Sequence, residues 1–399
     1  INSHFDYAFS YDFAEKWILN HFDIQSLTSI GISEFQNAVI ASGAALDYLK
    51  YNQKNTLSNL FKITYYQPED KMILDYPTRK NLEIFESNNI NKKNSALLDV
   101  IDYTKTAMGS RKLKSWLSQP LTDLDKINLR LQHTKAFLNE FDISSELRNS
   151  FEEIYDLERI LAKVTFESAN ARDLIALKNS LKVLPSIKEN LLSSKLNELM
   201  NIGEKLDSLN DLFLILDKSI SDDPPFTVRE GGLIKDAFNS ELDELREITF
   251  KGKEWISALE NREKEKTGIK NLKIGFNKIF GYYLEITKSN IGQAPDYFIR
   301  KQTLANAERY ITPELKEMEA KVIGADDKIK KLEYELFSEI RKIIKEKYSQ
   351  RIITVANVLS ELDVIVSLAF AAQKNNFTCP VMNIEDNMSI EALRHPVVE

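Results

Sequence analysis

The sequence contains few of the residues from which covalent cross-links and metal centres are built. One cysteine, Cys379, is present among 399 residues, which excludes a disulfide within the chain. The four histidines are scattered, and none has a second histidine or a cysteine at ligand spacing. We therefore expect structural or surface histidines, no metal site, and a reducing, cytoplasmic setting.

Long apolar runs and catalytic motifs are missing as well. No run of about 18 apolar residues occurs, so the sequence predicts no membrane span. The first residues, INSHFDYAFSYDF, do not follow the basic-then-apolar order of a signal peptide. There is no G-x-x-x-x-G-K-S/T phosphate loop, and no carboxylate pair or nucleophile set stands out. These absences argue against catalysis by this stretch of chain.

Glycine is scarce, with 12 residues in total, but four of them fall in one short segment between Thr267 and Pro313. From Gly268 to Pro313 the chain carries seven basic and three acidic residues, a net charge of +4, whereas the formal charge of the whole chain is -7. A basic, β-patterned island in an acidic, helical chain is typical of a module that binds a polyanion.

The remainder is mostly helical in pattern. Residues 1–75 are interpreted as part of an α/β domain, with a helix over 32–53 and two strands around a turn over 61–75. Apolar residues at three- and four-residue spacing predict an all-α bundle from about 77 to 220, in which Thr122 or Asp123 caps one helix. The chain begins without a methionine and ends on an apolar run, so we expect a piece of a longer protein.

Two long helices are predicted on either side of the basic island. The first has an apolar stripe that is expected to comprise Phe238, Leu242, Leu245, Ile248, Trp255 and Leu259. The second begins at a Thr312 cap and Pro313, and its stripe is expected to comprise Leu315, Met318, Val322, Ala325, Ile329, Leu332 and Leu336. Such stripes favour an antiparallel coiled-coil arm with the island at its tip. The alternative is an ordinary bundle with a long surface hairpin.

Within the island, alternation predicts two strands with one buried face each. Leu272, Ile274 and Phe276 share the buried side of the first strand, and Lys273 and Asn277 lie on its exposed side. The buried side of the second strand is expected to comprise Tyr282, Leu284 and Ile286. Four aromatic residues could stack on single-stranded bases, but their positions favour the core: Phe276, Phe280, Tyr282 and Tyr283.

Cations and short hydrogen-bonding side chains make up the rest of the island, notably in the segment RKQTLANAER over 300–309. Such groups bind phosphate oxygens without reading sequence. The candidate nucleic-acid contacts are Asn277, Lys278, Ser289, Asn290, Arg300, Lys301, Gln302, Thr303 and Asn306. The alternative is the solvated face of a small β domain.

Several long strings resemble the MutS family of bacterial DNA mismatch-recognition proteins. KIGFNKIFGYYLEITKSN and YFIRKQTLANAERYITPELKEMEAKVIGA are similar to the clamp region and the following lever helix of that family. Residues 97–121 and 231–248 resemble the start of its core domain and its descending lever. Residues 362–382 and 394–399 resemble the run into its ATPase domain.

The resemblance implies a mainly α fold, in which a helical core carries two antiparallel lever helices with a β-rich clamp at their tip. It implies these parts: connector 1–75, core 76–235, lever 236–266, clamp 267–312, lever 313–348, core return 349–383 and start of the ATPase domain 384–399. The clamp would grip duplex DNA. ATP with magnesium, mismatch reading, a homodimer and a MutL-type partner would belong to a longer, cytoplasmic, nucleoid-associated protein, and no cofactor is expected here.

A hypothesis from a different class remains. The two helices could form a coiled-coil scaffold whose tip binds another protein, in which case loss of the tip cations would leave DNA binding unchanged.

Overall fold

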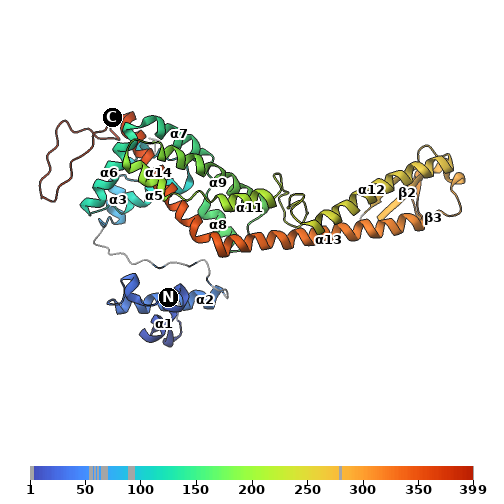
Figure 1. Cartoon of the computed structure of the whole chain (residues 1–399), viewed down its shortest axis with the longest axis horizontal. Helices are drawn as coiled ribbons and strands as arrows, with labels where there is room; N and C mark the ends of the chain where they lie inside the picture. The colour runs from blue at the N-terminus through green and yellow to red at the C-terminus, as the bar shows by residue number, and fades with distance from the viewer. Residues whose placement is uncertain are drawn as a thin grey trace. The chain divides into compact units, whose positions relative to one another are not determined.

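The computed structural model describes residues 4–53, 57, 60, 63, 71–88, 95–277 and 281–398. The chain divides into two compact units (Figure 1). The first comprises Ile1–Ala169, Ala176–Leu214 and Ile343–Glu399, and the second comprises Asn170–Ile175 and Ile215–Lys342. Helices dominate, and the strands form a single small antiparallel sheet among the described residues, which confirms the predicted mainly α fold.

The helices that begin or lie in the first unit include those predicted from apolar periodicity over about 77–220. They are α1 (Tyr11–Phe22), α2 (Gln36–Gln53), α3 (Tyr76–Asn81), α4 (Leu97–Ile101), α5 (Ala107–Ser118), α6 (Leu124–Asn139), α7 (Phe141–Glu152), α8 (Leu157–Thr165), α9 (Ala171–Leu192), α10 (Asn197–Lys205), α11 (Asn210–Ser219) and α14 (Ser349–Asn375). Short 3-10 turns η1 (Asp6–Phe9) and η2 (Leu27–Ile30) flank α1, and the π-helical turn η5 (Ile344–Tyr348) precedes α14. Helices α9 and α11 contribute residues to both units, and so does α13 (Pro313–Ile343) through its last residue.

Near the N-terminus, α1 and α2 pack closely because Gly43 has no side chain. A Cβ atom on Gly43 would lie 2.4 Å from Cα of Ala14. Helix α2 begins at Gln36, four residues later than predicted. Of the strand pair predicted over 61–75, only Ile63 and residues 71–75 are described, and Lys71 forms an isolated bridge to Leu121. The rest of that prediction lies outside the described residues.

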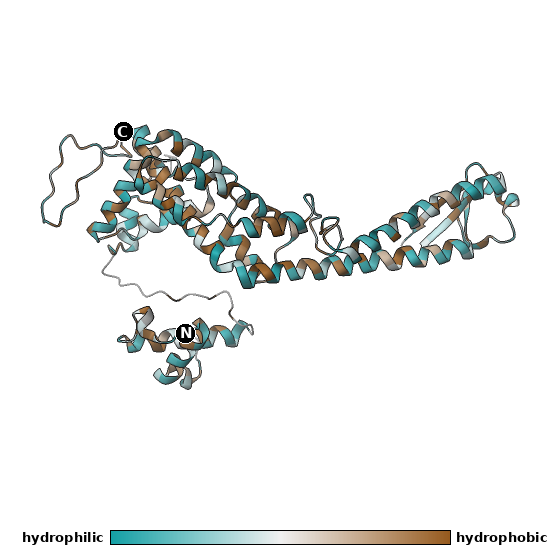
Figure 2. Ribbon diagram, viewed as in Figure 1, coloured by the Kyte–Doolittle hydropathy of each residue, from teal (hydrophilic) through white to brown (hydrophobic). Residues whose placement is uncertain are grey.

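Helix α14 forms the centre of the helical bundle and packs against α4, α5, α6, α7 and α8. Figure 2 shows hydrophobic and hydrophilic residues alternating along the helices of this bundle. The continuous helical segment Pro313–Asn375 contains a window apolar enough to cross a membrane, but 67% of that window is buried in the fold. A buried core helix of a soluble protein passes the same test of length and composition.

One carboxylate is buried inside this bundle. Asp363 on α14 accepts hydrogen bonds from the amides of Lys105 and Thr106 and from the Thr106 hydroxyl, at 2.7–3.1 Å. Burial raises the pKa of Asp363 above its usual value, although these hydrogen bonds oppose the rise. Gly109 leaves room for the carboxylate, since a Cβ atom there would lie 2.2 Å from Oδ2 of Asp363. The carboxylate therefore anchors the start of α5 to α14.

The second unit is built on two long helices, α12 (Ser240–Thr267) and α13 (Pro313–Ile343). The contacts between them include Arg246 with Glu333, Gly252 with Val322, and Arg262 with Glu314. Residue numbers rise along α12 as they fall along α13, so the helices run antiparallel, as predicted. Between them the chain forms β1 (Lys273–Asn277), β2 (Gly281–Thr287), the turn η4 (Lys288–Gln293), β3 (Ile299–Thr303) and β4 (Ala307–Ile311).

The contact stripe on α12 differs from the prediction by one position along part of its length. The buried residues are Leu242, Thr249, Gly252, Ile256, Leu259 and Glu263, which recur every three or four residues after a first step of seven. Ile248, which the prediction places in the stripe, is 49% exposed, and Trp255 is only half-buried. The prediction follows the most apolar side chains, but the close approach of the helices selects the small Gly252 instead.

On α13 the deviation has an electrostatic cause. Glu333, rather than a leucine, is buried, and its side chain is 1% exposed. Its carboxylate accepts hydrogen bonds from the Arg246 guanidinium at 2.5 Å and from the Leu233 amide at 2.9 Å. Phe337, one turn further on, is buried, whereas the predicted Leu336 is half-buried. A buried charge is tolerated here because it is paired and hydrogen-bonded.

The close packing of α12 against α13 can be tested at Gly252. A Cβ atom there would lie 2.3 Å from Cγ2 of Val322, whose β-branched side chain has little rotamer freedom in a helix. We expect Gly252→Ala to destabilise the second unit by about 1–3 kcal/mol through overpacking, measured by chemical unfolding. Val322→Ala in the same chain should recover part of that loss.

Gly324 on α13 is the matched control. No atom lies within 4 Å of the position its Cβ would take, so Gly324→Ala should stabilise the helix by up to about 1 kcal/mol. An increase in stability on Gly252→Ala would contradict the close packing of α12 against α13 at this residue.

Candidate nucleic-acid interface

The sheet at the end of α12 and α13 has the strand order β1-β2-β4-β3, with all neighbours antiparallel. One face is buried, where Leu284 and Ile286 pack with Leu272 against Leu259 and Leu315 of the helices. The predicted alternation in the second strand is therefore correct for its apolar aliphatic residues.

Two helix carboxylates attach the β1–β2 hairpin to the arm. Glu260 of α12 accepts a hydrogen bond from the Ile274 amide at 2.8 Å, and Glu319 of α13 accepts one from the Tyr282 amide at 2.6 Å. Strand β1 lies at the sheet edge, so the helix carboxylate satisfies an amide on that edge. Burial by itself would raise the pKa of the Glu260 carboxyl. The hydrogen bonds from Lys264 and the Ile274 amide outweigh this effect, so the pKa lies below its usual value.

Gly281 makes the second attachment possible. Its φ of +76° lies in the left-handed region, and a Cβ atom would lie 2.3 Å from Oε1 of Glu319. Only glycine avoids both the backbone strain and the collision with the carboxylate. The hairpin is thus held against α13 at a fixed place.

The structure places some of the predicted contact residues at opposite ends of the sheet, with Arg300, Lys301 and Gln302 on β3 between them. Asn277 lies where β1 meets β2, opposite Gly281. The other end begins at Thr287, which pairs with Ala307. The seven residues of β2 between these ends span roughly 20 Å at about 3.3 Å per residue. Lys278 lies outside the described residues.

At the second end, four predicted residues lie together: Ser289, Asn290, Thr303 and Asn306. The Lys288 amide donates to the Asn306 carbonyl at 3.1 Å, which joins η4 to the β3–β4 turn. A polar network precedes this junction. Asn271 donates to the Thr287 hydroxyl at 2.8 Å, the Thr287 and Ser289 hydroxyls lie 3.1 Å apart, and Asn290 donates to Asn271 at 2.8 Å.

Strand β3 carries an irregularity that changes which side its residues face. Arg300 pairs with Tyr310 and Gln302 with Arg309, so Lys301 is the extra residue of a bulge. Gln302 is half-buried and accepts a hydrogen bond from Arg309 at 3.0 Å. Gln302 and Arg300 therefore lie on opposite faces of the sheet.

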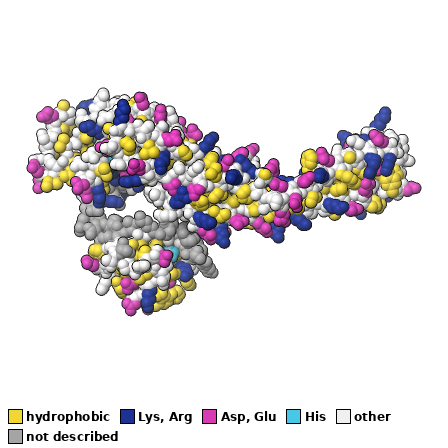
Figure 3. Space-filling view, viewed as in Figure 1, with side chains coloured by type: hydrophobic (Ala, Val, Ile, Leu, Met, Phe, Trp, Pro, Cys, Tyr) yellow, Lys and Arg dark blue, Asp and Glu magenta, His cyan; other side chains and the backbone are white. Residues whose placement is uncertain are grey.

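Cations at the tip differ in whether a carboxylate neutralises them. Arg300 lies 3.3 Å from Glu308, and Arg309 lies 2.9 Å from Glu285 and 4.2 Å above the Tyr283 ring. A second class consists of exposed lysines that have no carboxylate at ion-pair distance within the described part of the chain: Lys270, Lys273, Lys288 and Lys301. Of these, Lys273 lowers the pKa of the Glu260 carboxyl through its charge. Figure 3 shows Lys and Arg side chains gathered over this tip.

Lys270 and Lys288 were not among the predicted contacts. Their charges contribute to the basic excess of the island, but nothing in the local sequence distinguishes a free lysine from a paired one. That distinction depends on which carboxylates the fold brings near, so only the net charge of the segment could have indicated them.

The aromatic residues of the tip do not all enter the core. Phe276 is 52% exposed, contrary to the prediction, and its ring lies 5.0 Å from that of Tyr282. Burial decreases from Leu272, just before β1, through Ile274 to Phe276. Tyr282 and Tyr283 are half-buried, and Phe280 lies outside the described residues.

A buried acid–phenol pair lies beside Arg300. Glu308 accepts a hydrogen bond from the Tyr310 hydroxyl, which lowers the pKa of the Glu308 carboxyl. Burial, with the same hydrogen bond, raises the pKa of Tyr310 to about 12. The Glu308 carboxylate therefore stays ionised at neutral pH, and the phenol stays neutral.

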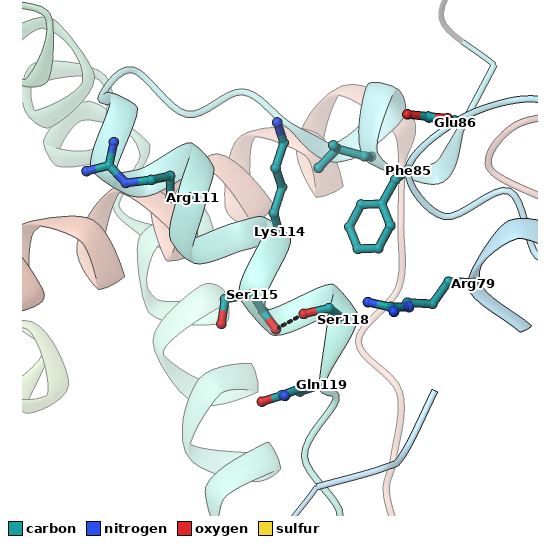
Figure 4. Close-up of a pocket in the computed structure, with 9 residues that line it drawn as sticks. Arg79, Phe85, Glu86, Arg111, Lys114, Ser115, Ser118 and Gln119 are labelled. Carbon is teal, nitrogen blue, oxygen red and sulfur yellow. Dashed lines mark hydrogen bonds between the residues drawn. The ribbon is translucent and has the colours of Figure 1, made fainter. Parts of the chain in front are cut away.

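Elsewhere, the described residues line a groove of about 520 Å³ between the segment after α3 and helix α5 (Figure 4). Its basic side chains do not converge on one point. Arg111 turns away to Asp156 and Glu158, while Arg79 and Lys114 approach from different elements. No group of three or more His, Cys, Asp or Glu side chains that could hold a metal occurs among the residues the structure describes.

Comparison with known proteins gives a consistent result. A family model described as MutS domain III matches residues 77–369. A DNA mismatch repair protein MutS from Halothermothrix orenii is 48% identical over 97% of this chain and 43% of its own length. Those of Alkaliphilus oremlandii and Ruminiclostridium cellulolyticum are 45% and 47% identical over 100% and 98% of this chain. They are covered over 45% and 44% of their lengths, so the chain spans less than half of each relative.

The Tyr310 pair predicts a pH dependence at the alkaline end. The pKa of Tyr310 is raised from 10.0 to about 12, so its contribution to stability is fully present below pH 10 and is lost as the pH rises towards 12. Over that interval the stability of the wild type should fall relative to Tyr310→Phe by roughly 2 kcal/mol, measured by unfolding. Tyr334→Phe, on the exposed surface of α13, is the control, and parallel curves for wild type and Tyr310→Phe would refute the assignment.

Proposed function

We propose, since this chain belongs to the MutS family of DNA mismatch repair proteins, that the tip of its second unit binds the backbone of duplex DNA without reading base sequence. The resemblance predicted from the sequence is confirmed by the family match and by relatives that are 45–48% identical over nearly the whole chain. The DNA contact itself is our inference from the chemistry of the tip.

The observation that carries the proposal is the presence of exposed lysines without an ion pair in the described chain, among them Lys270, Lys288 and Lys301. Ammonium groups on flexible stems bind phosphates as point charges and release condensed counterions, which gives affinity without sequence preference. Exposed hydroxyl and amide groups beside them, at Ser289 and Asn306, supply neutral donors of the kind that fix register on a phosphate backbone.

Functions of a longer protein follow only from the relatives. The 399 residues contain no phosphate loop, so we assign ATP binding and hydrolysis, with magnesium, to sequence outside them. Mismatch recognition, a homodimer, a MutL-type partner, and a cytoplasmic, nucleoid-associated location are proposed in the same way for that longer protein. The part proposed to reside in this chain is the grip on duplex DNA.

A salt titration tests the proposal. Duplex binding by the 399-residue chain should weaken as salt rises and should be equal for matched and mismatched duplexes. Changing Lys270, Lys288 and Lys301 together to Gln should lower the slope of log K against log salt by about 0.9 for each phosphate that the variant no longer neutralises. Fluorescence anisotropy with a labelled duplex measures both quantities.

Three lysines exposed on the long helices form the matched control: Lys253, Lys328 and Lys331. Their change to Gln alters the net charge equally and should leave the slope nearly unchanged. If the tip variant and the control variant behave alike, the tip is not the DNA contact, and the protein-binding scaffold becomes the better explanation.

A further inference from the structure

Among the tip cations, Arg300 is the one whose side chain is both highly exposed and paired with a carboxylate in the described part of the chain. Its side chain is 64% exposed, whereas that of its partner Glu308 is 9% exposed. Glu308 also accepts hydrogen bonds from the Tyr310 hydroxyl and, at 3.5 Å, from the Thr303 hydroxyl. The carboxylate is therefore held in place by the sheet, while the guanidinium that it contacts reaches into solvent.

Arginine is the side chain best suited to a phosphate, because its planar fork can donate two parallel hydrogen bonds. A carboxylate presents the same features as a phosphate: negative charge and a pair of oxygen acceptors. We propose that Glu308 occupies Arg300 as an internal substitute for a DNA phosphate, and that this competition lowers the affinity of the tip for duplex DNA. The inference rests on the proposed function and adds an affinity-determining residue to it.

The contact between Arg300 and Glu308 has the geometry of an exchangeable pair. One guanidinium nitrogen lies 3.3 Å from one carboxylate oxygen, and most of the guanidinium surface stays open to solvent. An approaching phosphate could share Arg300 or displace Glu308 without moving the sheet. The low pKa of Glu308 means that the carboxylate remains charged, and so competes, throughout the neutral range.

The second arginine of the sheet provides a built-in comparison. Arg309 pairs with Glu285, but its side chain is only 19% exposed, lies over the Tyr283 ring and also donates to Gln302. It lies on the opposite face of the sheet from Arg300. Arg300 is paired with Tyr310, and the neighbouring residues Arg309 and Tyr310 of β4 point to opposite faces. We expect this pair to be a fixed structural link, so that releasing Arg309 adds little to DNA binding.

The test compares Glu308→Gln with Glu285→Gln in the whole 399-residue chain. Each change removes one negative charge from the tip and keeps a hydrogen-bonding oxygen. Glu308→Gln should tighten duplex binding by about 5-fold at low salt and steepen the salt slope by about 0.9, because one more cation becomes available to phosphate. Glu285→Gln should change the affinity by less than about 2-fold.

A double-mutant cycle identifies the route of the effect. If Glu308 acts through Arg300, then Glu308→Gln should have no further effect in an Arg300→Gln background. Equal tightening by Glu308→Gln and Glu285→Gln would overturn the inference in favour of net charge alone. Unchanged or weaker binding by a folded Glu308→Gln variant would also overturn it, and would make Glu308 a residue that positions Arg300.

A wild-type chain that binds no duplex would refute the proposed function and this inference together. Unaltered affinity of a folded Glu308→Gln variant, beside a wild type that binds, would refute the inference alone. If Glu308→Gln fails to fold, side-chain NMR of the wild type decides the question. The Arg300 guanidinium signals should shift when duplex is added at low salt while those of Arg309 stay in place, and unshifted Arg300 signals would overturn the inference.

Discussion

The antiparallel contact between α12 and α13 is the constraint on which the second unit depends. Because Gly252 has no side chain, Val322 packs directly onto the α12 backbone, and the two helices stay in contact along a three-four stripe. At one end, the buried Glu333–Arg246 pair fixes the register of the helices. At the other, their adjacent ends force the intervening 45 residues, 268–312, to close on themselves, and an antiparallel sheet satisfies the backbone of that segment.

Carboxylates have two different roles within the tip. Glu260 and Glu319 reach from the helices to strand amides and attach the hairpin to the arm. Glu285 and Glu308 lie in the sheet and neutralise arginines. The positive charge available to a ligand is therefore not the formal excess of the segment but the set of lysines that no carboxylate of the described residues reaches. Placement by the fold, rather than composition, determines which cations face a polyanion.

Local signals in the sequence were sufficient for the elements but not for their contacts. The caps at Asp123 and Thr312 and the first part of the stripe on α13, from Leu315 to Ala325, follow from neighbouring residues, and the structure contains them. The α12 stripe was misplaced because a hydrophobicity pattern cannot register a glycine that packs through its missing side chain. Phe276 was assigned to the core because the alternation of a strand does not show which positions on its inner face other side chains cover. Which cations of the candidate site are neutralised depends on their ion pairs with carboxylates, and these ion pairs join residues on different strands.

The length of α12 separates the charges at its start from the charges at its end by more than the range of electrostatic interaction in salt. The 28 residues of α12 extend about 42 Å at 1.5 Å per residue, roughly four times the Debye length at 0.1 M salt. Charges at the start of α12 are thus screened from a phosphate held at its end, so the acidic balance of the chain does not oppose binding there. A phosphate responds mainly to the few charges within about 10 Å, among which a single carboxylate such as Glu308 is a large fraction. A small number of tip residues can therefore set the affinity of the whole arm.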